Sequence, residues 1–110
     1  MHARHEEFVN QVKKYVSNVN EDAVAGIIKH LGIAIGNKNA ELVSCSGKAE
    51  LNRIRDGFMK KKLALKDSNA DLEAALDEIC EKMGKSNPAK SRVAFYYLLA
   101  EKYGMLDKFV

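Results

Sequence analysis

The sequence is poor in the residues that mark several specialised classes of protein. It has one proline, no tryptophan and two cysteines among 110 residues. The low proline content and an apolar share of 46% exclude collagen-like and disordered chains. Two cysteines are also too few for a secreted scaffold framed by disulfides. Because Cys45 and Cys80 form no CxxC motif or other pairing pattern, we expect a reducing compartment.

Long apolar segments are missing as well. The longest apolar run, Val93–Ala100, has eight residues, whereas a membrane-spanning helix needs roughly 20. The N-terminus carries His, Arg and Glu where an export signal would have an apolar region of about 7–15 residues. We therefore expect a cytoplasmic protein with no membrane segment.

The length is typical of one domain. A chain of 110 residues falls in the range of roughly 100–200 residues per domain and buries enough surface to fold without staples. We therefore expect a single helical domain over residues 1–110.

Apolar side chains recur every three or four residues along most of the chain, and no stretch alternates with period two. This pattern predicts an all-α fold with five main helices. The predicted helices cover residues 4–18, the stretch between Asn20 and Gly36, residues 48–63, the stretch between Ser68 and Gly84, and residues 88–103.

Polar residues at the predicted boundaries support these limits. Asn20 offers a side-chain acceptor at the start of the second helix, and Ser68 with Asp71 forms a variant capping box before the fourth. Asn87 followed by Pro88 has the pattern of a cap and first helical residue, which predicts that the fifth helix begins there.

A weak internal similarity favours two packed helical hairpins plus an N-terminal helix. A shift of 48 residues places Val24 on Leu72 and Gly36 on Gly84. The similarity has two interpretations: a true duplication, or the chance alignment of any two amphipathic helices. The fifth helix has no polar face, so we expect it to be central.

The C-terminal part of the chain holds the candidate interface. Tyr96 and Tyr97 cannot both leave their hydroxyls in the core without partners, so at least one should reach the surface, a polar neighbour or a second subunit. Phe109 and Val110 belong to a short apolar tail. These four residues predict a contact with an unknown protein or with a second copy as a homodimer.

Charge is distributed unevenly along the chain. Residues 47–66 have a net charge of +5 and residues 67–84 a net charge of −5. One interpretation is intramolecular pairing between neighbouring helices, which is worth little per exposed pair. The other is a site for nucleic acid or another anionic ligand. Its candidate residues are Arg53, Arg55, Lys60, Lys61 and Lys62. On a regular helix Lys60 to Lys62 spread over about 200° of arc, which argues against a single basic face.

No combination of residues has the spacing of a catalytic or metal site. His2, His5 and His30 match no zinc-ligand spacing with the cysteines. Cys45 lies between two serines and is the more exposed thiol expected; it either gains reactivity from the start of the following helix or is buried and inert, the commoner outcome. Cys80 falls on an apolar stripe. We expect no catalytic residue, no metal and no cofactor.

Two stretches resemble a known family. One runs from Asp22 to Leu65 and contains Val-Ser-Cys-Ser at 43–46 and Phe-Met-Lys-Lys-Lys-Leu at 58–63; the other is Arg-Val-Ala-Phe-Tyr-Tyr-Leu-Leu-Ala-Glu-Lys-Tyr-Gly at 92–104. Together they resemble a bacterial family known as domain of unknown function 2853, from about residue 8 onward. The resemblance implies a small helical protein and transfers no active-site residue. Our leading expectation is a protein-interaction module or homo-oligomer without catalytic activity; the alternative is a weak binder of nucleic acid or anionic ligands.

Overall fold

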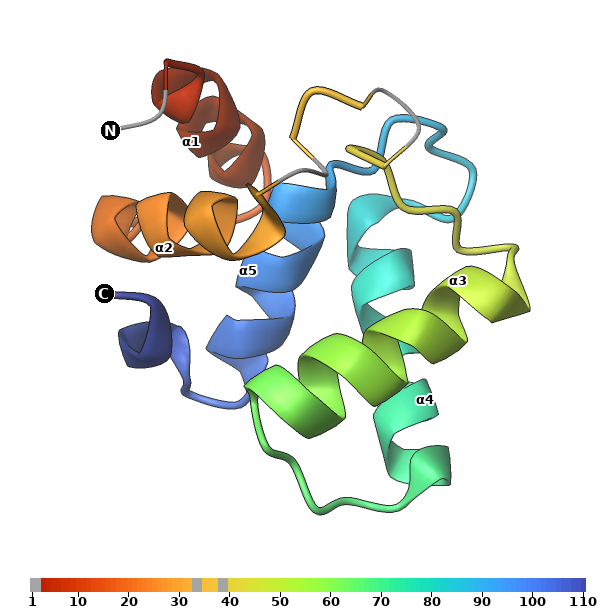
Figure 1. Cartoon of the computed structure of the whole chain (residues 1–110). Helices are drawn as coiled ribbons and strands as arrows, with labels where there is room; N and C mark the ends of the chain where they lie inside the picture. The colour runs from red at the N-terminus through yellow and green to blue at the C-terminus, as the bar shows by residue number, and fades with distance from the viewer. Residues whose placement is uncertain (1–2, 33–34, 38–39) are drawn as a thin grey trace. The chain divides into compact units, whose positions relative to one another are not determined.

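The computed structural model describes residues 3–32, 35–37 and 40–110, and these are helical for the most part (Figure 1). The elements are α1 (His5–Lys13), α2 (Glu21–Leu31), α3 (Lys48–Arg53), η2 (Ile54–Lys62), α4 (Asn69–Met83), α5 (Arg92–Lys102) and η3 (Leu106–Phe109). Extended pairing in the described residues amounts to one antiparallel bridge between Leu42 and Ser91. The predicted all-α class is therefore confirmed. Within the same described ranges, no helix is long and apolar enough to span a bilayer.

The chain divides into two compact units. The first consists of residues 1–43 and 89–110, and the second of residues 44–88. The second unit is thus an insertion, in sequence, between two parts of the first.

Helix α5 is the organising element of the first unit. All eight residues from Val93 to Ala100 are buried, as expected for a helix without a polar face. It packs against α1, α2 and η3. The Tyr97 hydroxyl accepts a hydrogen bond from the backbone N–H of Asn20 at 2.9 Å, and Asn20 caps α2 by accepting from Ala23 N–H at 3.1 Å. The buried phenol of Tyr97 therefore links α5, the central helix of the first unit, to the start of α2.

The C-terminal segment lies directly on α2 (Figure 1). A Cβ atom added to Gly26 would lie 1.8 Å from the carbonyl oxygen of Phe109. The absent side chain at Gly26 is what allows η3 to approach so closely, and Phe109 is buried as a result.

The second unit is a helical hairpin made by η2 and α4. Ile54, Phe58 and Met59 are the buried residues of η2. The buried positions of α4 recur at helical spacing and are Leu72, Ala75, Leu76, Ile79, Cys80 and Met83. The two elements contact each other, so each covers the apolar side of the other.

The predicted third helix has the right limits but two geometries. Its first six residues form α3, and the next nine form a π-helix, η2. The i→i+5 pattern is seen where Leu63 N–H donates to Phe58 O at 2.9 Å. Apolar periodicity cannot distinguish these geometries, because both place residues four or five apart on one side.

The fourth helix begins and ends as predicted. Ser68 Oγ accepts a hydrogen bond from Asp71 N–H at 3.2 Å, and Gly84 follows the last turn with φ of 93°. The fifth helix, in contrast, begins later than predicted. Its cap is Ser91, whose Oγ accepts from Ala94 N–H at 3.2 Å. Asn87 instead donates from Nδ2 to Met83 O at 3.2 Å and so caps the end of α4.

The first two helices are shorter than predicted. Helix α1 ends at Lys13 rather than near residue 18, because the chain turns there and leads to the Asn20 cap. Helix α2 ends at Leu31 rather than at Gly36, since Gly32 adopts the left-handed φ of 50° that stops it. Part of the segment between these two glycines, residues 33–34, lies outside the described residues.

The pairs of helices differ from those that the internal similarity favoured. That similarity joined the second predicted helix to the third and the fourth to the fifth, whereas α2 packs on α5 and η2 packs on α4. Long-range packing determines which helices lie against an all-apolar helix such as α5. The local sequence pattern does not contain this information.

Candidate functional site

The hairpin of η2 and α4 carries many charged residues. Arg55 of η2 has a side chain that is 14% exposed. Its guanidinium donates to Asp56 Oδ1 at 2.9 Å and lies 3.5 Å from Glu73 Oε2 on α4. The hydrogen bond from Arg55 lowers the pKa of the Asp56 carboxyl, and the same bond raises the pKa of Arg55. Arg55 is thus part of an internal ion cluster.

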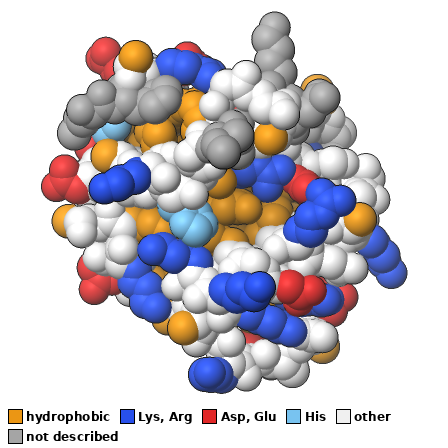
Figure 2. Space-filling model, in the orientation of Figure 1, with side chains coloured by type: hydrophobic (Ala, Val, Ile, Leu, Met, Phe, Trp, Pro, Cys, Tyr) orange, Lys and Arg blue, Asp and Glu red, His pale blue; other side chains and the backbone are white. Residues whose placement is uncertain are grey.

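The other predicted basic residues point in more than one direction. Arg53 is 78% exposed and lies 3.8 Å from Glu50, a loose contact. Lys60 lies 3.5 Å from Asp56, Lys61 is exposed and Lys62 is half-buried. Figure 2 shows Lys and Arg side chains over the part of this face where η2 lies, with carboxylates among them. The five residues therefore divide into Arg55, which is held in an internal ion cluster, and a group that is more exposed.

Exposed carboxylates lie on the neighbouring helix α4. Asp71, Glu73 and Asp77 are all exposed there. We call a group of exposed charges in this unit the hairpin surface; its basic part is Arg53 of α3 with Lys60 and Lys61 of η2, and its acidic part is Asp71, Glu73 and Asp77 of α4.

The predicted interface residues belong to α5 and the C-terminal segment and not to the hairpin of η2 and α4. Tyr96 and Tyr97 are 8% and 1% exposed, and both hydroxyls have polar neighbours. Tyr96 Oη accepts from Arg92 Nη1 at 3.3 Å. Phe109 is buried, whereas Val110 is 71% exposed. We expected at least one tyrosine hydroxyl to reach the surface, a polar neighbour or a second subunit. Both hydroxyls contact a polar neighbour.

The cysteines are paired, which corrects the expectation of two separate thiols. Cys45 and Cys80 form a disulfide with a Cα–Cα distance of 6.0 Å. The expectation was wrong because the residues are 35 positions apart and only the packing of the hairpin brings them together. Cys80 is buried, as its apolar stripe predicted, and Cys45 is half-buried.

Two cavities lie beside this disulfide, both within the second unit. The larger has a volume of about 270 Å³, and its walls include Cys45, Lys48, Glu73 and Asp77. The smaller has a volume of about 170 Å³ and is bounded by both cysteines and Asp77, among others. The bridge is therefore accessible from a hollow that carries both signs of charge.

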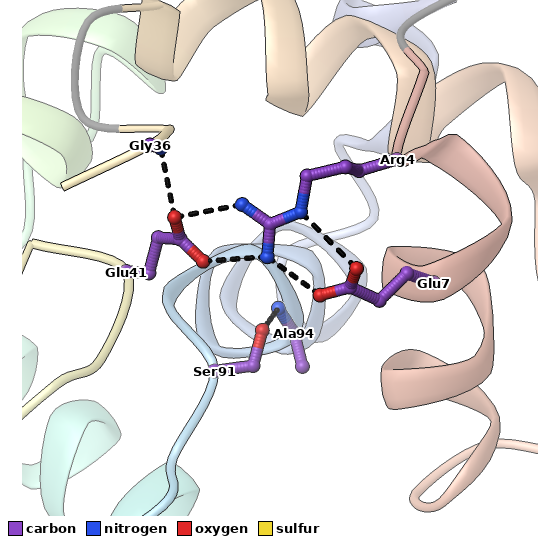
Figure 3. A network of polar contacts seen from close by, with 6 residues as sticks. All are labelled: Arg4, Glu7, Gly36, Glu41, Ser91 and Ala94. Carbon is purple, nitrogen blue, oxygen red and sulfur yellow. Dashed lines mark hydrogen bonds and ion pairs between the residues drawn. The ribbon is translucent and has the colours of Figure 1, made fainter. Parts of the chain in front are cut away.

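A second ion cluster ties α1 to the segment before the hairpin (Figure 3). Arg4 donates to both carboxylate oxygens of Glu41 at 2.8 Å and also to Glu7. Glu41 in turn accepts from Gly36 N–H at 2.7 Å. The hydrogen bond from Arg4 lowers the pKa of Glu7, and the bonds to Glu41 and Glu7 raise the pKa of Arg4. All groups are matched internally, so this cluster is structural.

The histidines do not meet at a common point. His5 is buried, with Nε2 3.6 Å from Glu21 Oε1, whereas His30 is exposed and lies edge-on to Phe109. His2 lies outside the described residues. In the parts of the chain that are described, no three His, Cys, Asp or Glu side chains are grouped to hold a metal ion.

Sequence reasoning missed the cavity beside the disulfide and the role of Glu41. The lining residues Cys45, Lys48 and Asp77 of this cavity come from a loop and two helices, and only the packing of the hairpin brings Asp77 to the other two. The nearest signal was the position of Cys80 on the buried stripe of α4, which placed one sulfur but not its partner.

Comparisons with known proteins place the chain in a family without assigning an activity. No curated protein matches it. A family described as protein of unknown function, DUF2853, matches residues 7–107. The match begins within the first turn of α1, ends within η3 and includes every helix between them. The chain therefore belongs to the DUF2853 family.

Proposed function

We propose that the protein is a protein-interaction module without catalytic activity, and that its contact surface is the hairpin surface. The observation that carries this proposal is that opposite charges stay exposed on two adjacent helices. Arg55 pairs with Glu73, but Lys61 and Asp77 face solvent. Charges of both signs side by side favour a protein partner, because a polyanion would be repelled by the acidic part.

The partner that we propose is a second copy of the chain, because its charges are complementary to those of the hairpin surface. In a dimer with twofold symmetry the same patch contacts itself, so the basic part of one copy meets the acidic part of the other twice. Each exposed pair contributes little, about 0.2–1 kcal/mol, so several pairs must act together. The proposed dimer is therefore weak and is sensitive to salt.

Sedimentation velocity with a charge swap tests this proposal. Lys61→Glu and Asp77→Lys each place like charges together in the dimer, so each variant alone should be monomeric at concentrations where the wild type associates. Mixing them should restore association, because the introduced carboxylate meets the introduced ammonium while Asp77 of one copy meets Lys61 of the other. Lys29→Glu, an exposed lysine of α2, is the matched control and should not alter association.

A wild type that stays monomeric at low salt and high concentration would refute the second copy as partner. Affinity enrichment from native extract, comparing the wild type with Lys61→Glu, then tests a different protein partner. A partner retained equally by both proteins would exclude the hairpin surface.

Binding of an anionic ligand is a second candidate, and the exposure of Arg53 favours it. It predicts binding to nucleic acid that weakens steeply with salt and is reduced by Lys60→Glu combined with Arg53→Glu. A flat titration at low salt would remove this candidate.

We further propose that the protein acts in the cytoplasm. A reducing cytoplasm opens most disulfides, so this location requires the Cys45–Cys80 bridge to be reversible. Trapping thiols in acid-quenched cells tests the location: a mixture of open and closed forms supports it, and a uniformly closed bridge contradicts it.

A further inference from the structure

The Cys45–Cys80 disulfide differs from a buried structural bridge in the exposure of one of its residues. Cys80 lies on α4 and is 1% exposed, whereas Cys45 is half-buried and borders both cavities. Cys45 is therefore the residue of the bridge that lies nearer to solvent. This asymmetry distinguishes an attacked sulfur from a leaving one.

The larger cavity supplies charges for a ligand beside that sulfur. Lys48, the first residue of α3, and Glu73 and Asp77 of α4 are among the residues that line it. Lys48 suits a ligand carboxylate, and Asp77 suits a ligand ammonium group, since Glu73 already pairs with Arg55. A volume of about 270 Å³ lies just below the range of about 300–1,000 Å³ usual for small-molecule sites, so it suits a small ligand rather than a large cofactor.

We propose that the Cys45–Cys80 bridge is a thiol–disulfide exchange site for a small peptide thiol that carries both carboxylate and ammonium groups, as glutathione does. The thiolate attacks Sγ of Cys45, a mixed disulfide forms at Cys45, and the bond to Cys80 breaks. Sγ of Cys80 leaves with the electron pair and takes a proton from water. A second thiolate attacks the mixed disulfide at the sulfur of the bound peptide, which releases the oxidised peptide and leaves two reduced cysteines.

Two residues that line the cavity have different roles in this exchange. Cys45 carries the transferred group, and Lys48 positions the peptide by pairing with its carboxylate. Lys48 should therefore affect the reaction of a charged peptide reagent and leave that of a small neutral reagent unchanged.

Full-length Cys80→Ala leaves Cys45 as a single thiol and simplifies the measurement. The thiolate of Cys45 attacks glutathione disulfide, which forms the protein mixed disulfide and releases one glutathione thiolate. Intact-mass spectrometry gives the rate, and hydroxyethyl disulfide serves as the neutral reagent. We expect Lys48→Ala to slow the reaction with glutathione disulfide about tenfold, the loss of one charge-assisted contact, without changing that with hydroxyethyl disulfide.

Lys66→Ala is the matched control, because Lys66 is an exposed lysine of the same unit that does not line the cavity. It should leave both rates unchanged. Equal effects of Lys48→Ala and Lys66→Ala, or equal slowing with both reagents, would overturn the proposal.

Wild-type protein provides a second measurement that does not depend on the folding of Cys80→Ala. Glutathione should open the bridge faster, relative to 2-mercaptoethanol, in the wild type than in Lys48→Ala, and peptide mapping should place the adduct on Cys45. An adduct on Cys80, or an unchanged ratio of the two thiols, would contradict the assignment.

Discussion

At the scale of single residues, Gly26 determines how the C-terminal segment meets α2. The carbonyl of Phe109 occupies the space that any Cβ at this position would need. The contact is to backbone, which cannot rotate away as a flexible side chain could. A side chain at residue 26 would therefore displace the backbone of the buried Phe109.

Gly26→Ala should therefore lower the free energy of unfolding by about 1–3 kcal/mol, the usual cost of overpacking. Urea denaturation followed by circular dichroism measures it. Gly57→Ala is the matched control, because nothing lies within 4 Å of a Cβ at that position in η2. If the two variants lose the same stability, the close approach of Phe109 is not the cause.

Two carboxylates make stability depend on pH in the acid range. Hydrogen bonds from Arg4 and Arg55 lower the pKa of Glu7 and of Asp56 in the folded protein. A group with a lowered folded pKa stabilises the fold above its unfolded pKa of about 4, and this contribution is lost as the pH falls through the lower folded value.

We expect the free energy of unfolding to fall below about pH 4, and to fall less steeply when Glu7→Gln and Asp56→Asn are combined. Urea titrations at several pH values measure both slopes. The interpretation fails if the double variant keeps the slope of the wild type.

At the scale of the elements, the start of α5 depends on Ser91 and not on Asn87. Ser91→Ala removes the acceptor for Ala94 N–H and should lower the free energy of unfolding by about 1 kcal/mol. Asn87→Ala should cost less, since its bond to Met83 O supports only the end of α4. Thermal denaturation ranks the two variants, and the reverse order would support a helix that begins at Pro88.

The accuracy of sequence prediction varied among the helices for physical reasons. The limits of α4 could be predicted because Ser68 and Gly84 act on the helix next to them. The limits of α2 and α5 could not, because Gly32 as well as Gly36 can stop a helix and Ser91 as well as Asn87 can cap one, and the prediction used only Gly36 and Asn87. Long-range packing selected among them.

The candidate site was less predictable than the helices. The basic residues of η2 could be found from composition, but their division into an internal anchor at Arg55 and an exposed group depends on Glu73 of α4. The disulfide could not be predicted, because its cysteines are 35 positions apart and carry no motif.

At the scale of the whole molecule, the disulfide closes a long loop that includes most of the second unit. Joining two residues that are 35 positions apart lowers the conformational entropy of the unfolded chain. This loss stabilises the folded protein by about 3–4 kcal/mol. We expect the combined variant Cys45→Ala and Cys80→Ala to be less stable than the oxidised wild type by that amount. The stability of this double variant should be close to that of the reduced wild type. Denaturation curves of the oxidised wild type, the reduced wild type and the double variant measure the three stabilities. Equal stability of the oxidised and reduced wild type would contradict the expectation.

The central claim is that the hairpin surface recognises a second copy of the chain. The most direct measurement is zero-length carbodiimide cross-linking of a mixture of ¹⁴N- and ¹⁵N-labelled protein, which joins lysines to carboxylates that touch and identifies links between copies by their mixed isotopes. The account predicts mixed-isotope peptides that join Lys60 or Lys61 of η2 to Asp71, Glu73 or Asp77 of α4. Links confined to single copies, or mixed links located only on α1, α2 or α5, would contradict it.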